Sequence, residues 1–140
     1  MYALSRLRKD RAGTSALEFA IIAPLFFLVL FTIIAYGIYL SVANSVQQIA
    51  ADAARTAVAG INSTERVSLV NHYLEATRLD YSFVNRTKMQ VVISDDPGNS
   101  DQFTVAISYD SSDLPIWGLF TFALPGKKIE RYATVRIGGI

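Results

Sequence analysis

The fold of this chain is decided by residues 19–40, whose sequence is FAIIAPLFFLVLFTIIAYGIYL. This run of 22 residues contains no acidic or basic side chain. As an α-helix it reaches about 33 Å, enough to cross the roughly 30 Å hydrocarbon core of a bilayer. A secretory signal peptide has a shorter apolar region, and a buried helix of this length needs a much larger protein around it. The run therefore predicts one membrane-spanning helix.

Charge is distributed unevenly on the two sides of this run. The short segment before it is basic, with Arg6, Arg8, Lys9 and Arg11 offset by a single acid. From Thr14 onward the chain has nine basic residues against eleven acidic ones, a balance that argues against nucleic acid as a partner. By the positive-inside rule, we expect the N-terminus in the cytoplasm and the remainder of the chain across the membrane.

The helical pattern continues beyond the apolar run. Small or branched apolar residues recur every three or four positions at Val42, Val46, Ile49, Ala53 and Ala57. Polar residues separate them, which indicates an amphipathic helix that packs on a folded part. We expect one helix from about Thr14 to Ala59, with Gly60 as its C-cap. Pro24 removes one helical hydrogen bond and is expected to kink the helix near its start.

A second helix is predicted to follow directly. Asn62 with Glu65 three residues later forms a capping-box pattern, which marks a helix N-terminus. The expected apolar stripe of this helix is Val67, Val70, Leu74 and Tyr81, and the expected end is near Leu79 or Asp80.

The apolar period then changes from the helical value to two, which indicates strands. Met89, Val91 and Ile93 alternate with more polar neighbours, and a second alternating run contains Phe103, Val105, Ile107 and Tyr109. The Asp-Pro-Gly-Asn cluster between them favours a turn and an antiparallel pair. Residues 129–137 are the expected third strand. The predicted fold class is α+β: a long N-terminal helix, a second helix and an antiparallel sheet of three or more strands.

Residues 114–125 are almost entirely apolar and are bracketed by Pro115 and Pro125. Twelve residues are too few to span a bilayer. We interpret the segment as a loop or short helix that covers the sheet. The alternative is an apolar surface that meets the membrane or another subunit.

The sequence motif that bears on function lies where the basic segment meets the span. Gly13 is followed five residues later by Glu18, and the apolar run begins immediately after this acid. An acid at the entrance of a lipid-facing helix is costly, so it needs an explanation. Glu18 either lies hydrated near the positive end of the helix dipole, or pairs with a new amine. A cut after Gly13 would create that amine on Thr14, and Glu18 of a neighbouring helix could then neutralise it.

This arrangement resembles the prepilin-type signal of the type IV filament superfamily, and more closely the TadE-like pseudopilins of the tight-adherence (Tad, or Flp) pilus. The resemblance rests on several positions along the first helix and on the last strand, namely Gly13, residues 16–20, Pro24, Gly37, residues 51–55 and residues 132–136.

The resemblance implies a minor pilin or pseudopilin that is cleaved by a prepilin peptidase between Gly13 and Thr14. It implies a role in pilus assembly, adhesion and biofilm formation.

The expected organisation is a leader over residues 1–13, a helix over 14–60 that spans the membrane at about 19–40, and an outer α+β domain over 61–140. The implied location is the bacterial inner membrane, with the domain in the periplasm and possible incorporation into an extracellular pilus. The implied partners are the peptidase, other pilins and the assembly platform in the inner membrane. An uncleaved accessory protein of the Tad secretion machinery is the alternative.

Catalytic and metal-binding patterns are not apparent in the sequence. The chain has no cysteine and a single histidine, His72, which argues against a metal site. Asp95, Asp96 and Asp101 are a possible cation loop, but a solvated turn explains them more simply. We therefore expect neither an enzyme nor a cofactor nor a small-molecule substrate.

Overall fold

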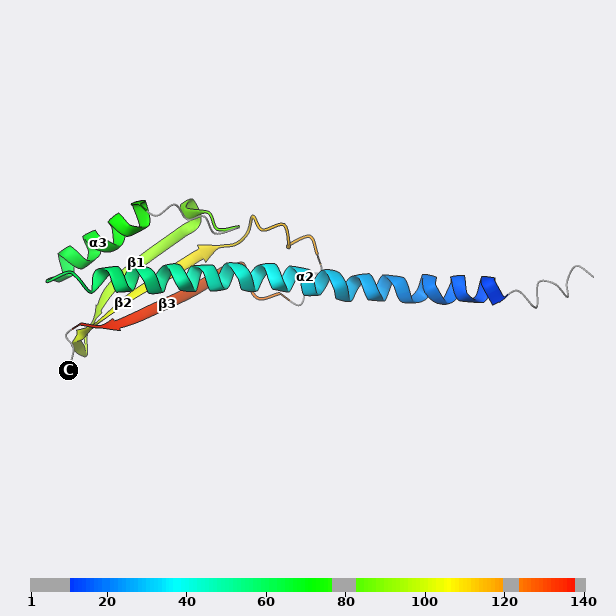
Figure 1. The fold of residues 1–140 in the computed structure, drawn as a ribbon, viewed down its shortest axis with the longest axis horizontal. Helices are drawn as coiled ribbons and strands as arrows, with labels where there is room; N and C mark the ends of the chain where they lie inside the picture. Colours follow the sequence, from blue (N-terminus) through cyan, green and yellow to red (C-terminus); the bar gives the residue numbers. More distant parts are fainter. Residues whose placement is uncertain (1–10, 77–82, 120–123, 138–140) are drawn as a thin grey trace, which may run out of the picture.

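The structure is a computed structural model that describes residues 11–76, 83–119 and 124–137. Figure 1 shows an elongated molecule in which a single long helix, α2, projects far beyond a small α+β part. This part consists of the described residues from 61 to 137, and we call it the body. The predicted fold class is confirmed. The described elements are, in chain order, α2 (Arg11–Ala57), α3 (Ser63–Ala76), the 3-10 turn η1 (Arg86–Lys88), β1 (Met89–Asp96), β2 (Asn99–Asp110) and β3 (Lys128–Arg136).

Helix α2 has two halves with opposite surroundings. Residues 13–34, which we call the stalk, contain no buried residue. From Ala35 onward one face of the helix is buried, and we call this set the core face of α2: Ala35, Tyr39, Val42, Ala43, Val46, Ile49, Ala50, Ala53, Ala54 and Ala57. The predicted positions from Val42 to Ala57 are all members of it. Because six of the ten residues of the core face are alanine, the helix backbone lies close to the sheet and to α3.

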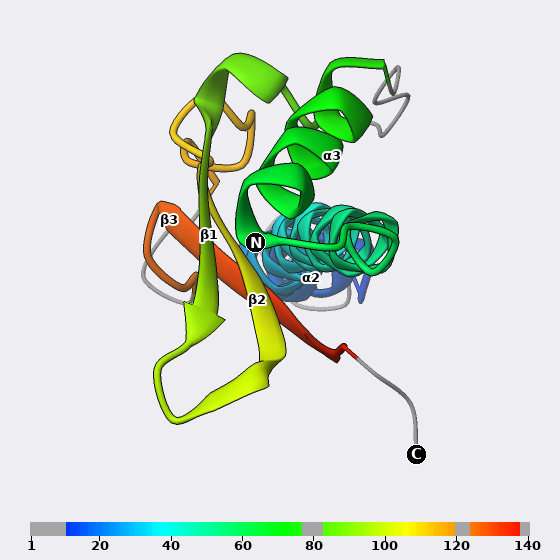
Figure 2. The ribbon, with the colours of Figure 1, turned by 90° about the vertical axis from the view of Figure 1, so that its left-hand side faces the viewer.

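The sheet has the order β1-β2-β3, and both strand pairs are antiparallel. Phe103, Val105, Ile107 and Tyr109 of the central strand are buried, so the predicted alternation is confirmed. Helix α2 contacts β2, β3 and α3. The end-on view in Figure 2 shows both helices on the same side of the sheet. The opposite side is covered by no described helix or strand.

The turn between β1 and β2 follows the prediction. Asp96 pairs with Asn99 across a two-residue loop of Pro97 and Gly98. The Asp96 carboxylate accepts a hydrogen bond from the Gly98 N–H at 2.8 Å. This Asx turn explains why an acid precedes the proline.

The start of α3 is close to the predicted capping box. The Asn62 side chain accepts a hydrogen bond from the Glu65 N–H at 2.9 Å. The Glu65 carboxylate in turn accepts from the Ile61 N–H at 2.9 Å, one residue earlier than the standard box. The predicted C-terminal end near Leu79 or Asp80, and Tyr81, lie outside the described residues.

The predicted apolar stripe of α3 is only partly correct. Val70 and Leu74 are buried, whereas Val67 is 37% exposed. The residue buried one turn before Val70 is Arg66. Arg66 replaces an apolar residue there because it has polar partners on both sides, which the sequence pattern alone does not reveal.

Arg66 joins three parts of the body. Its Nη1 lies 3.1 Å from Oδ1 of Asp95 on β1, and its Nε donates to the Gly60 carbonyl at 3.3 Å. Its guanidinium carbon lies 6.0 Å from the centre of the Phe103 ring. The Ser63 hydroxyl donates to the other oxygen of Asp95. A buried cation needs such partners to offset its lost hydration.

Gly60 was predicted as the C-cap of α2, but the structure indicates a different reason for a glycine at this position. Helix α2 ends at Ala57, two residues earlier than expected, and Gly60 is not in the left-handed conformation of an αL cap. A Cβ at Gly60 would lie 2.7 Å from Arg66 Cγ and 2.9 Å from Arg66 N. The glycine is therefore required by the close approach of α3, and not by backbone dihedral angles.

The apolar segment after β2 is partly a cover for the core, as predicted. Leu114 and Ile116 are buried, while Trp117, Leu119 and Leu124 are partly buried and pack against the same core. The two ends of the segment are joined where Ser111 N–H and hydroxyl both donate to the Lys127 carbonyl, at 2.8 and 2.6 Å.

The steric role of Gly60 yields the first prediction. We expect Gly60→Ala to destabilise the body by about 1–3 kcal/mol, because the added methyl overlaps the α3 backbone. Gly126→Ala is the matched control, since a Cβ there meets nothing within 4 Å. The measurement is urea unfolding of the full chain in detergent micelles, followed by tryptophan fluorescence. Equal midpoints for the two variants would contradict the role given to Gly60.

The Arg66–Asp95 pair yields the second prediction. Removing Asp95 leaves the Arg66 guanidinium, whose side chain is only 10% exposed, without its anionic partner. Asp95→Ala is expected to lower the free energy of unfolding by about 1–3 kcal/mol. Asp52→Ala is the control, because it removes a pair with Arg55, whose side chain is 75% exposed, and such surface pairs contribute under about 1 kcal/mol. A smaller loss for Asp95→Ala than for Asp52→Ala would refute this account.

Candidate processing and assembly segment

The residues of the predicted processing site lie on the first turns of α2. Gly13, Thr14 and Glu18 are all exposed. A Cβ at Gly13 would meet nothing within 4 Å, so packing within the described chain does not require a glycine at this position.

Glu18 lies four residues after Thr14, which is about 6 Å along the helix axis and on the same face. Among the described residues it has no ion-pair partner. Beyond it the next acidic residue on α2 is Asp52, at the far end. Its carboxylate is therefore available to a group outside this chain, or to the Thr14 amine if the chain is cut.

The other predicted residues of this segment are placed less completely. Arg6, Arg8 and Lys9 lie outside the described residues, and Arg11 is the first residue of α2. Helix α2 is continuous across Pro24, as Figure 1 also shows. The kink at Pro24 stays a prediction.

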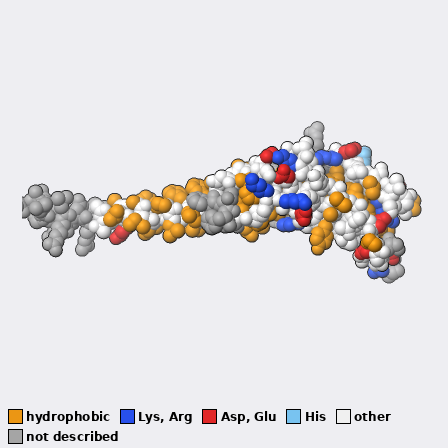
Figure 3. All heavy atoms as spheres, turned by 180° about the vertical axis from the view of Figure 1, so that it is seen from behind, with side chains coloured by type: hydrophobic (Ala, Val, Ile, Leu, Met, Phe, Trp, Pro, Cys, Tyr) orange, Lys and Arg blue, Asp and Glu red, His pale blue; other side chains and the backbone are white. Residues whose placement is uncertain are grey.

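The surface of the stalk is mostly apolar, and Glu18 is the single charged side chain among its residues. Its large exposed side chains include Leu17, Phe19 and Leu25, each more than 60% exposed, and Figure 3 shows this surface as a nearly continuous apolar rod. Helix α2 is long and apolar enough to cross a membrane, and only 6% of its most apolar window is buried inside the molecule. A helix of a soluble core would be mostly buried.

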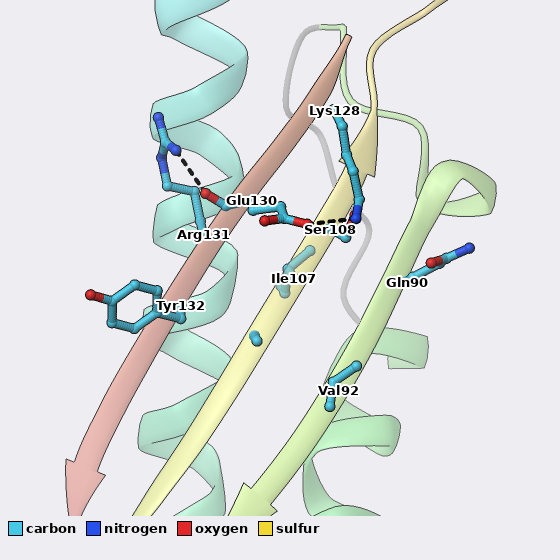
Figure 4. A pocket seen from close by; sticks show the side chains of 9 residues that line it. Gln90, Val92, Ile107, Ser108, Lys128, Glu130, Arg131 and Tyr132 are labelled. Atoms are coloured by element: carbon cyan, nitrogen blue, oxygen red, sulfur yellow. Dashed lines mark hydrogen bonds and ion pairs between the residues drawn. The ribbon is translucent and has the colours of Figure 1, made fainter. Parts of the chain in front are cut away.

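A shallow groove of about 400 Å³ lies on the open side of the sheet (Figure 4). Exposed Val92 and Tyr132 lie on its floor and side, and Lys128 pairs with Glu130 at 2.5 Å at one end. These groups form no nucleophile-base arrangement. Within the described residues there is also no group of three or more His, Cys, Asp or Glu side chains that could hold a metal ion.

The acidic residues considered as a cation loop have other partners. Asp95 binds Arg66 and Ser63, and Asp96 accepts from Gly98 within the turn. Asp101 donates its N–H to the Asn99 side chain at 3.0 Å. His72 is exposed on α3. These contacts agree with the interpretation of the loop as a turn.

Two charged groups at the stalk end of the sheet have shifted pKa values. The hydrogen bond to Asp113 raises the pKa of Lys88. Hydrogen bonds from the hydroxyl and N–H of Ser112 lower the pKa of Asp110. Both shifts favour the charged form of the group around neutral pH, and pairs so near the surface contribute little to stability.

Sequence reasoning missed two positions of the body that depend on distant contacts. Arg66 is one, although its place one turn before Val70 was a usable signal. The other is Phe83, whose φ of 69° is unusual for a residue other than glycine. Its carbonyl accepts a hydrogen bond from the Tyr109 hydroxyl at 3.0 Å, which supports this conformation.

Comparison with known proteins agrees with the N-terminal resemblance. A family model described as "TadE-like protein" matches residues 13–55, which begin at Gly13 and include the stalk and most of the core face of α2. No curated protein and no solved structure matches the chain. The TadE-like family consists of structural or accessory proteins of a pilus system. The match confirms the resemblance predicted from the sequence: residues 13–55, which are 43 of the 140 residues of the chain, are similar to the TadE-like family.

Proposed function

We propose that this protein is a minor pilin or pseudopilin of a Tad pilus, cut by a prepilin peptidase between Gly13 and Thr14. The observation that carries the proposal is the exposed apolar stalk with Gly13 and Glu18 at its start, in the segment that matches the TadE-like family; Glu18 forms no ion pair with a described residue. Before assembly the stalk spans the inner membrane. The basic segment is in the cytoplasm and the body is in the periplasm.

Cleavage would change the charge at the start of the helix. It removes the four basic side chains of the first eleven residues and leaves a positively charged amine on Thr14. That amine and Glu18 are then opposite charges near the edge of an apolar zone, where each is costly alone. Pairing between neighbouring helices would neutralise both charges and fix the axial offset between subunits.

The two halves of α2 differ in burial, and this difference supports a role in assembly for the stalk and not for the half that carries the core face. The core face is already occupied by the body, whereas none of the residues that the structure describes covers the stalk. In the membrane lipid covers the stalk, and in a filament the stalks of other pilins would take the place of lipid. The inner-membrane platform would deliver the subunits, and adhesion and biofilm formation would follow from the assembled pilus.

The processing step is tested by Gly13→Leu. We expect this variant to keep its leader, because a bulky residue blocks the cut, while its fold is unaffected by the open surroundings of Gly13. Gly37→Leu is the matched control, since Gly37 lies on the same helix and also has nothing within 4 Å. Intact mass and N-terminal sequence of protein recovered from cells give the result.

A wild-type chain that starts at Thr14, beside an uncut Gly13→Leu variant, supports processing. If wild type and Gly13→Leu both keep residue 1, the processed pilin is wrong and the uncleaved accessory protein is favoured. If both start at Thr14, Gly13 does not define the site.

The charge-pairing step is tested by Glu18→Ala. We expect the variant to be cut normally but to enter pili at least about tenfold less, because an unpaired amine in the apolar zone costs more than about 1.4 kcal/mol. Leu17→Ala, which shortens an exposed neighbour without changing charge, is the control. Quantitative immunoblotting of sheared pili gives the measurement. Normal incorporation of Glu18→Ala would exclude the proposed pairing.

A further inference from the structure

The body begins to cover α2 near the position along the helix where the outer boundary of the bilayer is expected. If Glu18 marks one boundary of the hydrocarbon core, about 30 Å at 1.5 Å per residue places the other boundary about 20 residues later, near Ile38. Ile34 is still 44% exposed, whereas Ala35 and Tyr39 are covered by the body. The end of the body that is nearest the stalk therefore lies at the level of the lipid headgroups, and not at a distance from the membrane.

The part of the body nearest the stalk is the segment after β2. Figure 1 shows this segment continuing beyond the end of β2, along α2 and toward the stalk. Its buried members, Leu114 and Ile116, hold it to the core. Pro115, which lies between them, and Gly118, which follows them, are exposed, and Trp117 and Leu119 are only partly buried. The segment thus has an inner side fixed to the core and an outer side with apolar groups still accessible.

The outer side combines an aromatic ring with a cation. Trp117 donates its indole N–H to the Ser111 carbonyl at 2.5 Å, which fixes the ring. The Lys127 ammonium lies 5.6 Å from the centre of that ring and makes no ion pair with a described residue. Nearby Lys88 is paired with Asp113, and Lys128 with Glu130. An indole beside an unpaired ammonium suits the zone between acyl chains and lipid phosphates.

We propose that Trp117, Leu119 and Lys127 form a membrane-contact surface, which rests on the outer headgroup region of the bilayer that α2 crosses. The occupant is lipid, because the calculated boundary of the hydrocarbon core falls where the body begins to cover α2, and the segment after β2 runs from the core toward the stalk. The contact seats the body on the membrane and fixes its height. This inference rests on α2 as a membrane span, and it does not depend on cleavage at Gly13 or on entry into a pilus.

The test uses Trp117 itself, which is the single tryptophan of the chain. The full chain is reconstituted in vesicles of phosphatidylethanolamine and phosphatidylglycerol that contain spin-labelled lipid. We expect about a twofold loss of emission with a label near the headgroup and little loss with a label at the acyl-chain end, as for an interfacial ring. Aqueous acrylamide is expected to quench weakly.

The matched control moves the reporter to the opposite end of the body. In Trp117→Phe combined with Ile61→Trp, the new indole replaces a side chain that is 87% exposed in the loop after α2. We expect acrylamide to quench it strongly and spin-labelled lipid to leave it unchanged. Flotation of both proteins with the vesicles after alkaline washing checks the span separately, so loss of the span is distinguishable from loss of the contact.

Two results would overturn the proposal when the span is intact. The first is quenching of Trp117 by acrylamide as strong as that of the Ile61→Trp reporter, with no effect of spin-labelled lipid. The second is protection of Trp117 from both quenchers, which would mean that the chain itself or a second copy covers the ring.

Discussion

The structure depends on the burial of one face of α2 against the sheet and α3. Ten residues from Ala35 to Ala57 form this face, and they are fully or almost fully removed from solvent. A three-stranded sheet with one open side has too little apolar surface to form a core by itself. The upper half of α2 supplies the missing surface, so the membrane anchor and the core of the body belong to a single helix.

The polar contacts around Arg66 determine how α3 attaches to that core. Arg66 connects the loop after α2 with β1, and its aliphatic part requires the absence of a side chain at Gly60. One buried cation thereby fixes the position of α3 relative to two other elements. Apolar contacts alone allow a helix to slide or rotate, whereas a guanidinium held by a carbonyl and a carboxylate has a defined geometry.

Much of this architecture was predictable because it follows local periodicity. Three sequence patterns directly indicate which residues are buried and which are exposed. They are the charge-free run, the spacing of three or four residues after Val42, and the alternation from Phe103 to Tyr109. Val67, Gly60 and Arg66 were misjudged or missed, since their burial is decided by contacts between α3, the loop before it and β1. At the N-terminus, the segment around Gly13 and Glu18 was recognisable as a motif. The partners that we propose for this segment lie outside this chain, so their identity cannot follow from the fold.

The continuity of α2 has a mechanical consequence. A force applied along the stalk is carried by the continuous helix into the body, where α2 runs alongside β2 and β3 (Figure 1). The load then acts parallel to the interface, as shear across all ten buried positions together, and does not peel them apart one by one. Resistance to such a pull is set by the rate of unfolding under load. A subunit drawn out of a membrane by its stalk would thus bring its body along as a rigid unit.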